Sequence, residues 1–240
     1  GDEPLLIAQH APVAVSSNRL DGARLLQEHG VDFIILDDGF QSMRLKTDYN
    51  LVVVDARRGV GNGHVIPGGP LRAPLTPQIG LASAVLRMGN GDAADAIVRM
   101  AARAGKPIHV AKTAPVRKMD LKSKRVFAFA GIADPEKFYD SLTLAGAHIS
   151  FTRSWPDHHF FEDDELTEIL RTAESGELTL VTTEKDAVRL LRGSEAARRV
   201  LEAALVFKIE VQFDQPDAPS YIIGQTLENF RRRMLKQAGA

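Results

Sequence analysis

Two adjacent carboxylates follow an apolar run near the start of the chain. Residues 33–37 read FIILD, and Asp38 and Gly39 come next. Such runs are typical of buried strands, yet two neighbouring negative charges are costly to bury. Ligands bind at the carboxyl ends of strands in open α/β sheets, and Mg²⁺ prefers hard oxygen ligands. We therefore interpret Asp37 and Asp38 as metal ligands, and a plain Asp–Gly turn remains the alternative.

A second candidate site is the glycine-rich stretch at residues 52–75, VVVDARRGVGNGHVIPGGPLRAPL. A strand ending in Asp55 leads into a loop with five glycines and the basic residues Arg57, Arg58 and Arg72. Glycine lets the backbone approach an anion closely, and arginine matches phosphate oxygens with a planar fork. The interleaving indicates phosphate binding, although a flexible surface loop is the simpler reading.

Two further segments combine polar groups with turns. SWPDHHFFEDDEL (residues 154–166) places Asp157 beside His158 and His159, which suits a general base or a proton relay but lacks a third zinc ligand. LVTTEKDAVRL (residues 180–190) reads as strand, turn and helix, with Thr183 or Asp186 as a cap. The simpler readings are a solvated histidine pair and an ordinary helix cap.

Composition limits the classes of protein to consider. The chain has 240 residues, 44% hydrophobic and 25% charged, with a formal net charge of −1 and no cysteine. This is ordinary globular composition, without the basic excess typical of nucleic-acid binding. Disulfides and thiolate sites are excluded, and no apolar run reaches 18 residues. Because the chain begins GDEPLLIA without a methionine, we expect a fragment.

The elements that would position these residues alternate between short apolar runs and helical patterns. Residues 19–29 predict a helix ending at Gly30, Asp134 and Pro135 open a helix to about residue 145, and Asp163 opens one through residue 174. This alternation indicates an α/β fold with mostly parallel sheets. The predicted strands are residues 12–16, 33–37, 51–55, 84–88, 108–113, 125–130, 148–152, 178–182 and 205–213.

The predicted division has two lobes. Residues 1–107 form the first lobe, residues 108–124 an extended, basic linker, and residues 125–204 a smaller second α/β lobe. Residues 205–240 return as a strand that pairs with residues 108–113, followed by a basic amphipathic helix. Such a helix can rest on anionic membranes, though a solvated basic face is commoner.

Together these segments resemble the tetraacyldisaccharide 4′-kinase family, which phosphorylates a lipid A precursor. The matching pieces occur in the family's order and span nearly the whole chain. The resemblance implies a P-loop NTPase-like, mostly parallel lobe, here incomplete, and a smaller α/β/α lobe joined by a two-stranded linker. The pieces are GDEPLLIA, DDGFQ, VVVDARRGVGNGHVIPGGPLRAPL, FAGIADPEKFYDSL, PDHHFF and TTEKDAVRL.

The resemblance also implies roles for individual residues. Asp37 and Asp38 correspond to the Walker B pair that holds Mg²⁺, and Asp2 corresponds to a catalytic base that acts with His158. We expect this dyad to assemble from opposite lobes when a cleft closes. The implied cofactors are ATP and Mg²⁺, the substrate is tetraacyldisaccharide 1-phosphate, and the location is the cytoplasmic face of the inner membrane as a peripheral protein. The expected cofactor-binding residues are Gln41, Arg58, Asn62 and Arg72.

The sequence departs from the family in one important respect. The Walker A pattern G-x-x-x-x-G-K-[ST] is absent, and the nearest Gly-Lys pair, Gly105-Lys106, is followed by proline. The family's P-loop precedes GDEP, so we expect it before Gly1 and expect weak ATP binding from this chain alone. The alternatives are a non-catalytic fragment that binds the lipid headgroup and an unrelated Mg²⁺-dependent ATPase.

Overall fold

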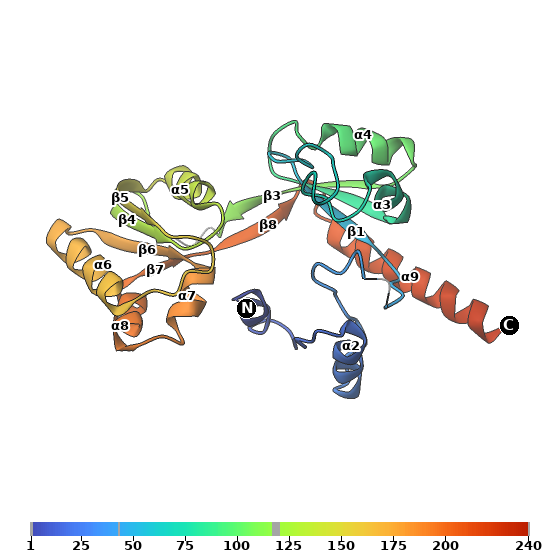
Figure 1. Cartoon of the computed structure of the whole chain (residues 1–240), viewed down its shortest axis with the longest axis horizontal. Helices are drawn as coiled ribbons and strands as arrows, with labels where there is room; N and C mark the ends of the chain where they lie inside the picture. Colours follow the sequence, from blue (N-terminus) through green and yellow to red (C-terminus); the bar gives the residue numbers. More distant parts are fainter. Residues whose placement is uncertain (1, 43, 117–120, 240) are drawn as a thin grey trace. The chain divides into compact units, whose positions relative to one another are not determined.

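A computed structural model describes residues 2–42, 44–116 and 121–239. The chain divides into two compact units, which we call unit 1 (Gly1–Val15 and Ala114–Glu210) and unit 2 (Ser16–Thr113 and Val211–Ala240). The described chain contains two four-stranded sheets, in the orders β5-β4-β6-β7 and β1-β2-β3-β8. Helices alternate with most strands, which gives the predicted mixed α/β class (Figure 1).

The sheet of unit 1 is parallel throughout. Strand β4 lies between β5 and β6. Its sequence RVFAFA is buried from the second residue onward. Both faces of β4 are therefore covered, as a continuous apolar run predicts. The strands are β4 (Arg125–Ala130), β5 (His148–Ser154), β6 (Thr179–Thr183) and β7 (Leu205–Phe207).

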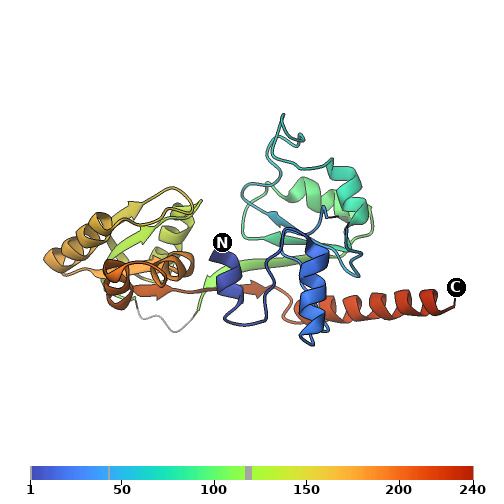
Figure 2. The ribbon, with the colours of Figure 1, turned by 60° about the horizontal axis from the view of Figure 1, so that its bottom comes forward.

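Helices cover both faces of this sheet. On one face, α5 (Pro135–Leu144) packs Phe138 and Leu142 against Val126 and Ala128 of β4. On the other face, Phe127 and Phe129 of β4 join a core built with the remaining helices (Figures 1 and 2). Alternate side chains of one strand thus supply two cores. Those remaining helices are α6 (Asp163–Gly176), α7 (Glu184–Leu190) and α8 (Glu195–Ala203).

Three helix starts in unit 1, those of α5, α6 and α7, agree with the sequence patterns to within one residue. Asp134 is the N-cap residue of α5, with Pro135 in its first turn. Thr183 is the N-cap of α7, and its hydroxyl accepts a hydrogen bond from the backbone of Asp186. The N-cap of α6 is Glu162 rather than Asp163, because a reciprocal capping box forms with the residue three positions after it.

Among its described residues, unit 2 has one cluster of buried core residues, which helices cover. Helices α3 (Leu75–Leu81) and α4 (Asp95–Arg103) pack Ile79 and Ile97 against Val54 and Val85 of the sheet. Strands β1, β2 and β3 are parallel to one another. The segment of unit 2 before residue 113 also contains α2 (Arg19–Glu28), which ends before Gly30 as predicted. The strands are β1 (Leu51–Asp55), β2 (Ala84–Met88), β3 (Ile108–Pro115) and β8 (Ile209–Phe213).

Three predicted strands differ from the structure. Residues 12–16 and 33–37 form no strand, since they have no ladder partner in the described chain, and residue 37 already lies in a turn. Ile35 is accordingly 84% exposed. The predicted strand at residues 205–213 is interrupted at Lys208, so that β7 pairs with β6 and β8 neighbours β3. The expected pairing of this return segment with β3 is therefore confirmed for β8.

The unit boundaries differ from the predicted lobes at the start of the chain. Residues 1–15 belong to unit 1. The predicted first lobe, residues 1–107, grouped them instead with the residues that now form most of unit 2. Part of the predicted linker, residues 117–120, lies outside the described part of the chain.

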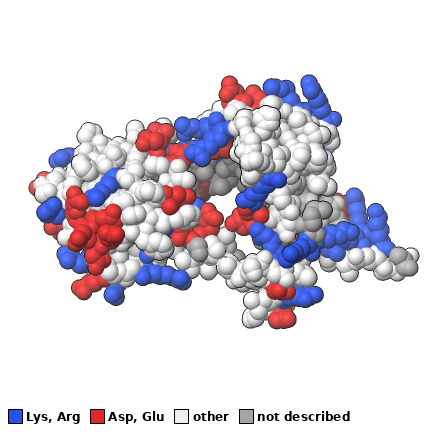
Figure 3. Space-filling view, in the orientation of Figure 1, with Lys and Arg blue, Asp and Glu red and all other residues white. Residues whose placement is uncertain are grey.

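Unit 2 ends in α9 (Ala218–Ala238), a 21-residue helix. Arg233 forms a bidentate pair with Asp48, with nitrogen–oxygen distances of 2.7 and 2.8 Å. Lys and Arg side chains gather along the end of this helix (Figure 3), and its described sequence includes the run RRR at residues 231–233. Across the described ranges, no helix combines the length and apolar character needed to cross a bilayer.

Candidate active site

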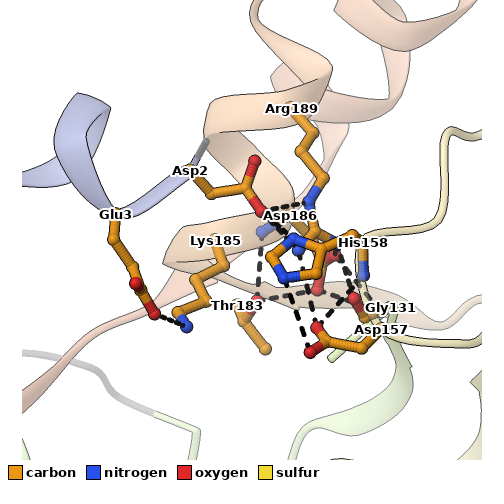
Figure 4. A network of polar contacts seen from close by, with 9 residues as sticks. All are labelled: Asp2, Glu3, Gly131, Asp157, His158, Thr183, Lys185, Asp186 and Arg189. Atoms are coloured by element: carbon orange, nitrogen blue, oxygen red, sulfur yellow. Dashed lines mark hydrogen bonds and ion pairs between the residues drawn. The ribbon is translucent and has the colours of Figure 1, made fainter. Parts of the chain in front are cut away.

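A polar cluster in unit 1 brings together residues from three distant parts of the chain (Figure 4). Asp2 is the first residue of α1 (Asp2–Ile7), and His158 lies in the loop that follows β5. The Nδ1 atom of His158 lies 3.1 Å from Oδ2 of Asp2. Its Nε2 atom lies 3.6 Å from a carboxylate oxygen of Asp157, whose other oxygen accepts a hydrogen bond from the His158 backbone. His158 therefore lies between two carboxylates.

From the family resemblance we expected Asp2 and His158 to come from opposite lobes and to meet when a cleft closes. That expectation was wrong, because both residues belong to unit 1 and are already in contact. Ion pairs between α1 and α7 explain the grouping: Lys185 lies 2.5 Å from Glu3, and Arg189 lies 2.6 Å from Asp2.

Arg189 is the centre of the cluster. Its Nε donates to Oδ2 of Asp2 at 2.7 Å, and its Nη1 donates to the carbonyl of Gly131 at 2.5 Å and to Oδ1 of Asp186 at 2.8 Å. The side chain is only 5% exposed, so these contacts are shielded from water. The hydrogen bond from Arg189 is the main reason that the pKa of Asp2 lies below its usual value, and His158 lowers it further against the effect of burial. Asp2 is therefore held as a carboxylate.

Asp186 supports Arg189 from the interior. Its side chain is fully buried and accepts hydrogen bonds from the Thr183 hydroxyl at 2.7 Å and from the Gly131 backbone at 3.2 Å. Burial raises the pKa of Asp186, opposed by these two donors and by Arg189. We call Asp2, His158, Asp186 and Arg189 the Asp2–Arg189 cluster.

The neighbouring His159 has a different environment. Its Nε2 lies 2.8 Å from Glu165, and its ring stacks on Trp155 with 5.8 Å between centroids. Glu165 also accepts hydrogen bonds from the Trp155 indole at 2.6 Å and from the Glu162 backbone at 2.9 Å. Burial raises the pKa of Glu165, but these hydrogen bonds, that of His159 first, outweigh it and lower the pKa overall. His159 therefore stabilises the start of α6, and His158 is the histidine of the candidate site.

The predicted metal ligands lie in unit 2, in the turn after residues 33–36. Asp38 has a positive φ of 49°, a backbone conformation that aspartate tolerates better than most residues. Its Oδ2 is paired with Arg72 at 2.8 Å, and its carbonyl accepts a hydrogen bond from Arg19 at 3.0 Å. The structure thus brings two of the predicted site residues, Asp38 and Arg72, together as an ion pair. Asp37 occupies the preceding position of the same turn.

The other predicted cofactor-binding residues lie nearby in sequence but have local roles in this structure. Gln41 donates to the side chain of Gln78 at 2.9 Å. Asn62 shapes the glycine-rich loop, since its amide donates to the Gly68 carbonyl at 2.8 Å and its oxygen accepts from the His64 backbone at 3.1 Å. The backbone of Arg58 donates to Asp55 at 3.3 Å, where the loop leaves β1. The loop is therefore an ordered turn structure.

Carboxylate oxygens of Asp37 and Asp38 fit Mg²⁺ by chemical type. Mg²⁺ keeps several waters and needs only one or two protein carboxylates. In the described residues no group of three or more His, Cys, Asp or Glu side chains is arranged to hold a metal. The two carboxylates match the small number of protein ligands that Mg²⁺ needs.

Arg189 was not among the residues predicted from sequence, and Asp186 was predicted only as a helix cap. Both stand in the segment TTEKDAVRL, three residues apart, so they share one face of α7. An acidic residue followed by arginine at this spacing, with the apolar residues Ala187 and Val188 between them, was the available signal.

Comparison with known proteins identifies the family. The family model for tetraacyldisaccharide-1-P 4′-kinase matches residues 1–227. The chain belongs to the tetraacyldisaccharide 4′-kinase family. Its members carry the name of a phosphotransferase, which agrees with the enzyme class expected from the motifs.

Relatives of this name are similar over nearly the whole chain. The protein of Mesorhizobium japonicum is 52% identical over 237 residues, which cover 98% of this chain and 69% of that protein. The corresponding protein of Chelativorans sp. is 51% identical, covering 99% of this chain and 69% of the relative. That of Rhizobium meliloti is 50% identical over 240 residues, covering 100% of this chain and 69% of the relative.

Proposed function

We propose that the protein transfers the γ-phosphoryl group of ATP to the 4′-hydroxyl of tetraacyldisaccharide 1-phosphate in lipid A biosynthesis. Membership of the tetraacyldisaccharide 4′-kinase family and the names of the relatives support the reaction class. The observation that carries the assignment to this chain is the contact of 3.1 Å between Asp2 and His158.

Asp2 is suited to accept the proton of the attacking hydroxyl. Arg189 and His158 both contact Oδ2, and no described residue forms a hydrogen bond with Oδ1. Figure 4 shows one Asp2 oxygen directed into the network and the other directed away from it. A positioned carboxylate of this kind contributes about 10²–10⁴-fold to a proton-transfer step. His158, at 63% side-chain exposure, is accessible to a substrate and orients the carboxylate.

The residues of unit 2 are suited to the nucleotide. Arg72 supplies a guanidinium that matches phosphate oxygens, and Arg58, Asn62 and Gln41 belong to the same region of the sequence. Asp37 and Asp38 would hold Mg²⁺, which neutralises charge on the transferred phosphoryl group when it is bound. Since Asp38 already pairs with Arg72, its carboxylate is oriented beside a cationic group.

The substrate fixes the expected location. A disaccharide with several acyl chains resides in a bilayer, so the enzyme meets it at a membrane surface. We propose peripheral contact with the cytoplasmic face of the inner membrane, where ATP is present.

The test is a transfer assay on the protein expressed from its own complete gene. Radiolabel from γ-labelled ATP should appear in tetraacyldisaccharide 1-phosphate presented in mixed micelles, and it should require Mg²⁺. ATP hydrolysis that proceeds equally without the lipid would contradict the proposal. Asp38→Asn should move the Mg²⁺ titration of activity to higher concentration, and an unchanged titration would remove Asp38 from the metal site.

A further inference from the structure

We propose that Arg189 is a positioning residue for Asp2, fixing Oδ2 so that Oδ1 is the oxygen presented to the acceptor hydroxyl. The inference rests on the proposed role of Asp2 and deepens it. Arg189 contacts Asp2 although it lies 187 residues later in the chain. It is not one of the candidate site residues predicted from sequence.

The two carboxylate oxygens of Asp2 have different contacts. Oδ2 lies 2.7 Å from Nε and 2.6 Å from Nη2 of Arg189 and 3.1 Å from Nδ1 of His158. The guanidinium therefore approaches one oxygen, not both, in contrast to the bidentate pairing of Arg233 with Asp48. A fork that bridged both oxygens would satisfy the carboxylate completely. The observed arrangement leaves Oδ1 without a hydrogen bond in the described part of the chain.

Arg189 is itself held on its other side. Its Nη1 contacts the Gly131 carbonyl at the end of β4 and the buried carboxylate of Asp186. Gly131 in turn donates its backbone N–H to Asp186. The guanidinium is thus held by the sheet end and by its own helix, and only 5% of the side chain is exposed to solvent. A side chain held in this way can fix the orientation of the Asp2 carboxylate that it contacts.

A purely structural role is the competing explanation, because Arg189 also ties α1 to α7. A matched control exists for this possibility. Lys185, one turn earlier on α7, pairs with Glu3 of α1 at 2.5 Å, and both side chains are more than one-third exposed. Lys185→Gln removes an attachment between the same two helices without touching Asp2.

Removing Arg189 has two effects of opposite sign on Asp2. The pKa of Asp2 rises, since the hydrogen bond from Arg189 is the main cause of its low value, so the carboxylate becomes a stronger base. Its orientation is lost at the same time, and misplacement of a catalytic group costs about 100-fold in rate. A stronger but slower base is a signature that loss of packing alone does not produce.

The experiment uses the complete protein with ¹³C-labelled aspartate. The Asp2 carboxyl resonance is assigned by its absence in Asp2→Asn and is titrated in wild type, Arg189→Gln, Arg189→Lys and Lys185→Gln. The double variant Asp186→Asn with Arg189→Gln removes the arginine without leaving Asp186 buried and unpaired, and it keeps the test decisive if Arg189→Gln does not fold. Turnover and KM for the lipid are measured against pH on the same samples.

The expected result is a higher Asp2 titration midpoint in Arg189→Gln and in the double variant, with kcat about 100-fold lower and KM changed less than about threefold. The acid limb of the rate profile should move to higher pH, Arg189→Lys should recover part of the activity, and Lys185→Gln should match wild type in all three readouts. An unchanged Asp2 titration, equal losses in Lys185→Gln, or failure of both the single and the double variant to fold would overturn the positioning role. Normal turnover in Asp2→Asn would instead refute the proposed role of Asp2 as the base while leaving the titration result intact, and absence of lipid-dependent transfer in the wild type would refute the proposed function.

Discussion

Substituting Asp186 with alanine tests whether the buried charges of unit 1 depend on one another. The side chain of Asp186 is fully buried and contacts Arg189 at 2.8 Å, the Thr183 hydroxyl at 2.7 Å and the Gly131 backbone at 3.2 Å. Alanine has no carboxylate, so all three contacts are lost at once. The Gly131 N–H then loses its hydrogen-bond acceptor, and the guanidinium of Arg189 loses one of its three carboxylate partners, keeping Asp2 and the more distant Asp157.

The expected cost follows from these contacts. Removing one partner of a buried ion pair typically costs about 3–5 kcal/mol, because the other charge stays buried and uncompensated. Arg189 keeps Asp2 as a partner, which places the loss near the lower limit, at about 3 kcal/mol. Asp186→Asn retains an oxygen for Gly131, so its loss should be smaller than that of alanine.

The assay is urea unfolding at pH 7, followed by tryptophan fluorescence. Trp155 is the single tryptophan of the chain, and it packs against the core of unit 1, so the signal reports that unit. The control is Glu168→Ala, which breaks an ion pair with Arg153 that is 51% exposed on the glutamate side and should change stability by less than about 1 kcal/mol. A loss in Asp186→Ala no larger than in this control would refute the reasoning about buried charge.

Two further predictions concern the same unit. Glu165→Gln should lower the free energy of unfolding by about 1–2 kcal/mol at pH 7 through weakened hydrogen bonds to His159 and Trp155. Because the folded pKa of Glu165 lies below its unfolded value near 4.5, this difference from wild type should be full above pH 4.5 and should close as the pH falls through the folded pKa; a gap independent of pH would contradict the assignment. Leu166→Ala, at a fully buried core position, should cost about 2–5 kcal/mol in urea unfolding, and a loss below 1 kcal/mol would show that the core of α6 is not close-packed.

Most of the fold could be predicted because buried parallel strands have a simple pattern. The runs LVVVD and AVLRM coincide with β1 and β2, and the Asp-Pro signal of α5 is located correctly. Residues 33–37 have an equally apolar pattern but form no strand, since pairing depends on a neighbour that an isolated run does not specify. The division of residues 205–213 between two sheets likewise depends on tertiary pairing.

The candidate site was only partly predictable for a related reason. Asp2 and His158 were named through the family resemblance, and their separation of 156 residues offers no local signal that they touch. The role of Arg189 depends on which carbonyl and which carboxylates surround its guanidinium, and these come from the residue after β4, from α1 and from α7. Sequence identifies groups able to do chemistry, whereas the topology decides which of them meet.

The central claim is that Asp2 and His158 act together to activate the acceptor hydroxyl. The most direct measurement is kcat for phosphoryl transfer to tetraacyldisaccharide 1-phosphate in Asp2→Asn, His158→Ala and the double variant, with the KM for ATP measured in parallel. We predict that each single variant loses about 10²–10⁴-fold in kcat, that the KM for ATP changes little, and that the double variant is scarcely slower than the worse single variant. Near-normal turnover in either single variant, or fully additive losses in the double variant, would contradict the account.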